Sequence, residues 1–104
     1  MATYDLDIVL RTFRKAKVEL VRRGWAPVRV HSTIGPTSLG MVFVGIPGWE
    51  MAIPVLAKVL DLPGDCPRNI IDWDDHVCES QTQAIDALDL AITAVDERIA
   101  ALTA

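Results

Sequence analysis

Residue types that commonly bind metals are concentrated in one short stretch of the second half of the sequence. Residues 72–79 read Asp-Trp-Asp-Asp-His-Val-Cys-Glu, so carboxylates, an imidazole and a thiol fall within eight residues. Cys66, His76 and Cys78 could supply three zinc ligands, with His31 or a carboxylate as the fourth. Structural zinc usually binds paired Cys-x2–4-Cys or His-x3–5-His knuckles, and His76-x-Cys78 is neither. We therefore expect no metal and no cofactor, and interpret residues 72–79 as an acidic approach to the last helix.

The same residues give little support for catalysis. His76 and Cys78 are neighbours in the sequence, but a catalytic Cys-His pair is assembled by the fold and not by adjacency. Cys66 has no basic neighbour closer than Arg68 to activate its thiol. The chain also has no nucleophile elbow, no phosphate-binding glycine loop and no His-Glu metalloprotease motif. We predict that the protein is not an enzyme.

A strongly basic stretch near the N-terminus is the next candidate. Six basic residues and one acidic residue, Glu19, fall between positions 11 and 23. On a helix Arg11, Lys15 and Arg22 share one side, where they could bind phosphates, so a nucleic-acid-associated protein is the alternative function. The opposite interpretation is a solvated face, or a face docked on acidic residues of the last helix. The overall pI near 4.9 and the absence of a helix-turn-helix pattern make nucleic acid the weaker prediction.

The C-terminal quarter carries a heptad pattern. Its apolar residues recur with strict 3-4 spacing, as in a coiled coil, at Ile85, Leu88, Ile92, Val95, Ile99 and Leu102. We call this set the heptad seam. Alanines beside it would permit close approach of another helix, and the first five seam residues are our predicted protein-interaction site. The pattern leaves open whether the seam faces a partner or the protein's own core.

These candidate sites need helices to position them. A first helix is predicted from Leu6 to Gly24, with an apolar face of Leu6, Val9, Leu10, Phe13, Ala16, Leu20 and Val21. The last helix is predicted from Gln81 to Leu102, after a Ser80–Gln83 capping box. A third helix covers Trp49 to Leu60. Residues 27–46 form either a short β-hairpin or a strand followed by a short helix, and 62–67 form a loop.

The composition describes one folded domain, residues 1–104. Hydrophobic residues make up 51% of the chain and charged residues 23%, which excludes intrinsic disorder. No apolar run approaches the ~20 residues of a membrane span, and no signal peptide is recognisable. We expect a cytoplasmic protein with reduced cysteines. The net charge of −4 is uneven, because residues 1–48 carry seven basic and three acidic groups, whereas residues 49–104 carry three basic and eleven acidic ones.

The two ends of the chain show a resemblance to other proteins. Arg23-Gly24-Trp25, Ile71-Asp72-Trp73-Asp74-Asp75 and the helix beginning Thr82-Gln83-Ala84-Ile85 resemble an uncharacterised family of small actinobacterial and phage proteins. In that family Asn stands at the position of Asp74, and the centre carries a Cys-x-x-Gly-Ala run that this chain lacks. The resemblance implies an actinobacterial or phage source and no particular activity. A phage protein of this size would act by binding a host protein.

Together these patterns predict a mainly α fold, a small bundle of about three helices with a long C-terminal helix packed on the first. A short hairpin in residues 27–46 would make it α+β instead. The predicted function is a protein-interaction module, acting on another protein such as a host protein, or as a homodimer. We expect Arg11, Lys15 and Arg22 to form a second, basic surface, and we expect no membrane partner.

Overall fold

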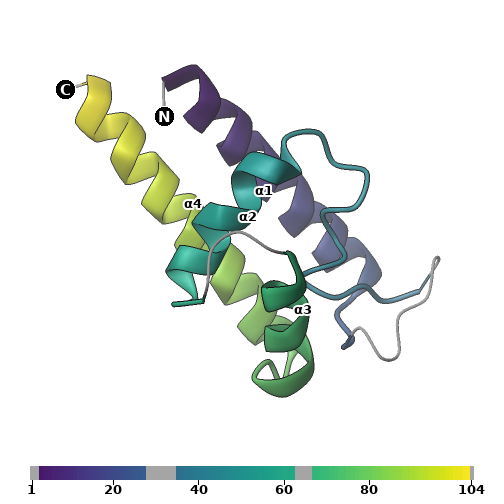
Figure 1. Cartoon of the computed structure of the whole chain (residues 1–104). Coiled ribbons are helices and arrows are strands. Elements are labelled where there is room, and N and C mark those ends of the chain that lie inside the picture. The colour runs from purple at the N-terminus through teal and green to yellow at the C-terminus, as the bar shows by residue number, and fades with distance from the viewer. Residues whose placement is uncertain (1–2, 28–34, 63–66, 104) are drawn as a thin grey trace.

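The computed structural model describes residues 3–27, 35–62 and 67–103, in which the regular elements are four α-helices. They are α1 (Thr3–Arg23), α2 (Trp49–Val59), α3 (Pro67–His76) and α4 (Gln81–Thr103). The two long helices α1 and α4 run side by side in opposite directions, and α2 packs against both (Figure 1). The predicted mainly α fold is therefore confirmed, including the packing of the long last helix on the first. The fourth helix, α3, was not predicted, and it contains most of the acidic stretch.

The first helix ends where its sequence predicts. Gly24 adopts φ +85°, and its N–H still donates to the carbonyl of Leu20 at 2.8 Å. A residue without a Cβ takes this left-handed conformation at little cost, so Gly24 turns the chain away from α1. Most of the predicted apolar face is buried, including Phe13 and Leu20. Val21 is the exception, because 54% of its surface is exposed.

The start of α4 is fixed by side-chain caps. The Gln83 N–H donates to Ser80 Oγ at 3.1 Å, which is one half of the predicted capping box. The Gln83 side chain reaches back to accept from the N–H of Glu79 at 2.9 Å, one residue earlier than a capping box requires. Both bonds satisfy amides that would otherwise lack a partner at the beginning of the helix. The predicted helix and its start are therefore confirmed.

Residues 35–46 contain no strand, and no hairpin is present in the described part of 27–46; residues 28–34 lie outside it. A single bridge joins Trp25 to Thr37, with Ala26 N–H donating to the Thr37 carbonyl and Thr37 N–H to the Gly24 carbonyl. The chain then forms successive turns over residues 38–48, which we call the turn segment, and in them Val42 N–H donates to the Ser38 carbonyl at 2.9 Å. The physical reason is the apolar spacing, which is helical and not alternating, at Leu39, Val42, Phe43 and Ile46.

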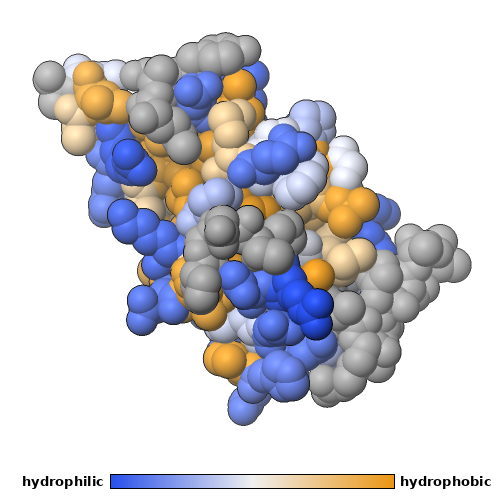
Figure 2. All heavy atoms as spheres, viewed as in Figure 1, coloured by the Kyte–Doolittle hydropathy of each residue, from blue (hydrophilic) through white to orange (hydrophobic). Residues whose placement is uncertain are grey.

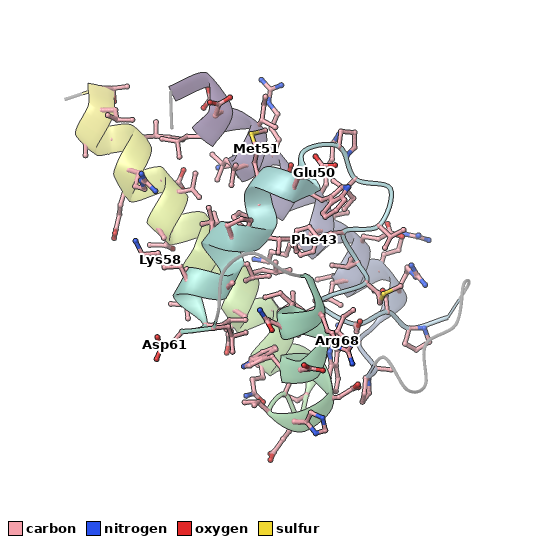
Figure 3. The ribbon with its side chains drawn as sticks, in the orientation of Figure 1. Phe43, Glu50, Met51, Lys58, Asp61 and Arg68 are labelled. Carbon is pink, nitrogen blue, oxygen red and sulfur yellow. The ribbon has the colours of Figure 1, made fainter. Side chains whose placement is uncertain are left out.

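The turns hold their apolar side chains against α1. The ring of Phe43 meets that of Phe13 edge-on, with centroids 6.0 Å apart, and Figure 3 shows Phe43 directed toward the helices whereas Lys58 and Asp61 point outward. Further along, Thr12 Oγ1 donates to the carbonyls of Ile8 and Pro47, at 2.8 and 2.9 Å. A three-centred bond of this kind fastens the end of the turn segment to α1.

The core lies between the α1–α4 pair and the elements that cover it. Helix α3 contributes Ile70 and Trp73 to this core, and α2 contributes Ala52, Ile53, Leu56 and Ala57. On the side of the molecule where α2 lies, hydrophobic side chains line a groove between α2 and α4, and hydrophilic side chains gather over α3 (Figure 2). No helix in the described residues is long and apolar enough to cross a membrane.

Candidate functional site

The acidic stretch contains a carboxylate that is turned into the protein. Asp74 lies on α3 and is fully buried. Its Oδ1 accepts from the Leu39 N–H at 2.9 Å and from the Trp25 indole N–H at 3.1 Å, and its Oδ2 accepts from the Gly40 N–H at 2.6 Å. One side chain thus joins α3 to the end of α1 and to the turn segment. We call these four residues the Asp74 corner.

Burial controls the protonation of this carboxyl group. Loss of solvent raises the pKa of Asp74 to about 6 from an ordinary 3.8, although the Trp25, Gly40 and Leu39 donors each favour the charged form and lower it. The nearby charge of Asp75 raises it further. A single buried carboxylate with three donors explains the geometry without a metal or a substrate. The corner is a structural feature of the fold.

A glycine lets the backbone approach closely at this corner. A Cβ on Gly40 would lie 2.7 Å from Ile71 Cγ1 and 3.3 Å from Asp74 Oδ2, so only glycine fits where the turn segment meets α3. At the end of α1, the Trp25 backbone N–H donates to Gln81 Oε1 at 3.3 Å, which adds α4 to the same assembly. The Gly-Trp and Trp-Asp-Asp motifs of the sequence therefore meet in space, in a packing role.

No group of three or more His, Cys, Asp or Glu side chains suited to a metal ion exists among the described residues. His76 is exposed at the end of α3. Cys78 is buried, its thiol donates to the Ser80 carbonyl at 3.3 Å, and burial raises its pKa, which disfavours the reactive thiolate. Cys66 and His31, the other proposed ligands, lie outside the described residues.

The heptad seam faces the protein's own core. Leu88 and Val95 are fully buried in it. Ile85, Ile92 and Ile99 are partly buried and pack against the same core, whereas Leu102 is 57% exposed. The five residues predicted to bind a partner thus form the side of α4 that contacts α1 and α2. A partner protein could reach Leu88 and Val95 only if the bundle opened.

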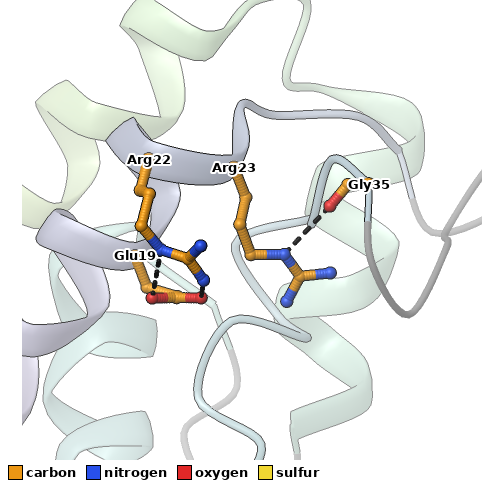
Figure 4. Close-up of polar contacts among 4 residues, drawn as sticks. All are labelled: Glu19, Arg22, Arg23 and Gly35. Carbon is orange, nitrogen blue, oxygen red and sulfur yellow. Dashed lines mark hydrogen bonds and ion pairs between the residues drawn. The ribbon is translucent and has the colours of Figure 1, made fainter.

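The basic residues of α1 fall into two groups. Three of them have their charge engaged within the chain. Lys17 Nζ lies 2.6 Å from Asp89 Oδ1 of α4. Figure 4 shows the other two: Arg22 donates to both carboxylate oxygens of Glu19, and Arg23 Nε donates to the Gly35 carbonyl at 2.9 Å. The other three, Arg11, Arg14 and Lys15, are exposed and form no ion pair with another described residue. Of the predicted basic surface, Arg11 and Lys15 are therefore available to a partner, and Arg22 is occupied.

Two valines lie among these cations. Val18 and Val21 are 67% and 54% exposed, and they share the outward side of α1 with Arg11, Arg14, Lys15 and Arg22. We call these six residues the basic face of α1. A shallow hollow of about 510 Å³ borders it, between α1 and the turn segment, where Arg14, Lys15 and Val18 approach Val44 and Ile46.

The outward side of α4 has the complementary character. Asp86, Leu90, Thr93 and Glu97 recur at helical spacing, are all exposed, and form the acidic face of α4. Neither face was predicted from the apolar patterns, because Val21 was assigned to the core and Leu90 stood off the seam. The signal that could have found them is an apolar residue on the charged side of an amphipathic helix.

No family model, curated protein or solved structure matches this chain. The resemblance of its two ends to small actinobacterial and phage proteins stays a prediction. What the molecule binds is therefore inferred from its own surface.

Proposed function

We propose that this chain is a protein-interaction module whose binding surface is the basic face of α1. The observation that carries the proposal is the exposure of Val18 and Val21 in the centre of a group of cations. Single exposed apolar residues are ordinary, but two of them one turn apart, ringed by charge, have the layout of an interface core with a polar rim. The matching partner presents apolar side chains flanked by carboxylates.

The same surface is a weak nucleic-acid site. Binding to a duplex relies on several phosphate contacts, commonly six to ten, and on the cations free to make them. On α1, Lys17 is paired with Asp89 and Arg22 with Glu19, which leaves three exposed cations outside ion pairs. The two valines add nothing to phosphate binding. These features favour a protein partner over a nucleic acid.

A matched pair of variants tests the proposal. Val21→Asp places a carboxylate in the basic face, and Val77→Asp makes the same change at an equally exposed valine next to α3 (54% and 53% exposed). Tagged wild type and both variants are used to capture proteins from a nuclease-treated lysate of the source organism. We expect wild type and Val77→Asp to retain the same protein, and Val21→Asp to lose it.

Two results would contradict the proposal. One is capture of the same proteins by all three forms, which would place the binding surface elsewhere. The other is retention of nucleic acid in a parallel sample without nuclease, with no protein retained once nuclease is added. That second result would support the nucleic-acid alternative, and binding should then weaken steeply with salt.

A further inference from the structure

The α1–α4 pair forms a layer with one covered side and one open side. The turn segment and α2 pack on the covered side, where Phe13 of α1 and Leu88 of α4 are buried. The outward side of each helix is exposed: it carries the basic face on α1, whose Lys15 also borders the turn segment, and the acidic face on α4, whose Glu97 also borders α2. Surfaces of opposite charge, each with exposed apolar side chains, thus lie on the two neighbouring helices of one layer.

The ion pair between Lys17 and Asp89 sets the register of this layer. The helices are antiparallel and both rise 1.5 Å per residue. Starting from the Lys17–Asp89 pair, a residue six positions before Lys17 on α1 therefore lies at the same height along the helix axes as the residue six positions after Asp89 on α4. Arg11 therefore lies at the same height along the helix axes as Val95. Glu97 is two residues further along α4, so its height differs from that of Arg11 by about 3 Å. By the same count Val18 is level with Leu88, about 3 Å from the level of Leu90.

A two-fold axis parallel to the two helices would preserve these levels. Rotation about such an axis, placed against the open side, lays α1 of each copy over α4 of the other without shifting either along its length. Arg11 then meets Glu97 of the second copy, and Val18 meets Leu90. An axis perpendicular to the helices would instead stack α1 on α1, setting Arg11 and Arg14 against their own copies.

We propose that the partner of the basic face is a second copy of this chain, bound as a two-fold dimer in which each α1 docks on the acidic face of the other α4. This inference rests on the proposed function and names its partner. Two helices of 21 and 23 residues, packed about 9 Å apart, present a layer of roughly 600 Å² per copy. About 1,200 Å² in total is the lower end for a specific interface, so the dimer should dissociate on dilution.

A charge exchange tests the docking. Wild type, Arg11→Glu, Glu97→Arg, the double variant and Arg68→Glu are compared by analytical ultracentrifugation over a wide concentration range. Arg68 is an exposed control on α3, away from the open side (Figure 3). Circular dichroism confirms that each variant is folded. We expect a wild-type dimer, a dissociation constant raised ~10-fold or more by each single exchange, near-complete recovery in the double variant, and no change in Arg68→Glu.

The inference is overturned if wild type is a monomer at every concentration, if a dimer is indifferent to both single exchanges, or if the double variant fails to recover. The lysate capture separates this failure from failure of the proposed function. A monomer whose captured protein is lost in Val21→Asp retains the interaction module with a different partner. A monomer that captures nothing through the basic face removes both proposals.

Discussion

The Asp74 corner and the acidic face of α4 use carboxylates in opposite ways. Asp74 is fully buried and accepts three hydrogen bonds from its own chain, whereas Asp86 and Glu97 are exposed and form no ion pair with another described residue. A buried carboxylate must find its partners inside the fold, because water is absent there. An exposed carboxylate contributes little to stability and is free to meet a partner. Burial therefore separates the charge that holds this fold together from the exposed charges that we propose recognise a partner.

The largest expected effect comes from removing the carboxylate. In Asp74→Ala the buried amides of Leu39 and Gly40 lose their acceptor, and unpaired buried donors cost about 1–3 kcal/mol each. We expect the free energy of unfolding to fall by about 4 kcal/mol in chemical denaturation at neutral pH. Asp74→Asn should cost less, because Oδ1 can still accept from Trp25 and Leu39, although the amide NH2 that replaces Oδ2 cannot accept from Gly40 and faces its N–H. Equal losses in the two variants would show that the hydrogen bonds are not what the corner contributes.

Stability should depend on pH through the same group. Between pH 4 and pH 6 the folded protein holds a proton on Asp74, whose pKa is about 6, while the unfolded chain has released it at its ordinary 3.8. The folded state therefore binds more protons in this window, and this contribution to stability falls as the pH rises. From the two pKa values the loss is at most about 3 kcal/mol. The measurement is the difference in unfolding free energy between wild type and Asp74→Asn at pH 4, 5, 6 and 7. A difference that is flat across this range would contradict the raised pKa.

A smaller effect is expected where the turn segment meets α1. A Cβ on Gly48, at φ +90°, would lie 2.7 Å from Thr12 Oγ1 and 2.8 Å from Ile8 Cγ2. We expect Gly48→Ala to cost about 2 kcal/mol in thermal or chemical unfolding, from backbone strain and the displaced Thr12. Gly45 is the matched control, because it has φ +84° and no described atom within 4 Å of its Cβ position. Gly45→Ala should therefore cost about 1 kcal/mol, the backbone strain alone. Equal costs at the two positions would mean that Thr12 moves aside freely.

The smallest effects on stability are expected on the open side of the α1–α4 layer. Lys17→Met removes an ion pair whose two side chains are 39% and 47% exposed, and such pairs contribute about 0.5 kcal/mol. We expect the unfolding free energy of this variant, measured at a concentration where the protein is a monomer, to stay within about that amount of wild type. A loss of more than about 1 kcal/mol would mean that this exposed pair stabilises the fold, as the buried Asp74 does, and that burial does not separate the two kinds of charge.

Much of the helical framework followed from sequence. Periodicity and end signals predicted α1, α2 and α4, because each carries an apolar stripe long enough to define a helical face. Helix α3 was missed, since its buried residues Ile70, Trp73 and Asp74 include a carboxylate, which a pattern of apolar positions excludes. The hairpin was proposed for residues 27–46, of which 28–34 lie outside the described residues, and the described residues that follow form successive turns instead of a strand.

The candidate surfaces were harder to predict than the framework. A heptad pattern shows that one side of α4 packs against something, but only the tertiary structure shows that α1 and α2 already cover it. The Asp74 corner was equally hidden, because two of its three donors are backbone amides, which every residue except proline possesses. The basic residues Arg11, Lys15 and Arg22 were predicted to share a surface, but the apolar residues of the two outer faces emerged only when the exposed fractions of Val18, Val21 and Leu90 were known.

The hydrogen bonds of Asp74 also determine how the turn segment opens to solvent. The amides of Leu39 and Gly40 belong to no helix or sheet, yet both are buried and bonded to a side chain of α3. Their exchange with deuterated water requires α3 to move away from the segment, and that movement exposes Trp73 and Ile70 of the core. We therefore expect the turn segment to open together with α3 as one cooperative unit, although by secondary structure alone it would be counted as a loop.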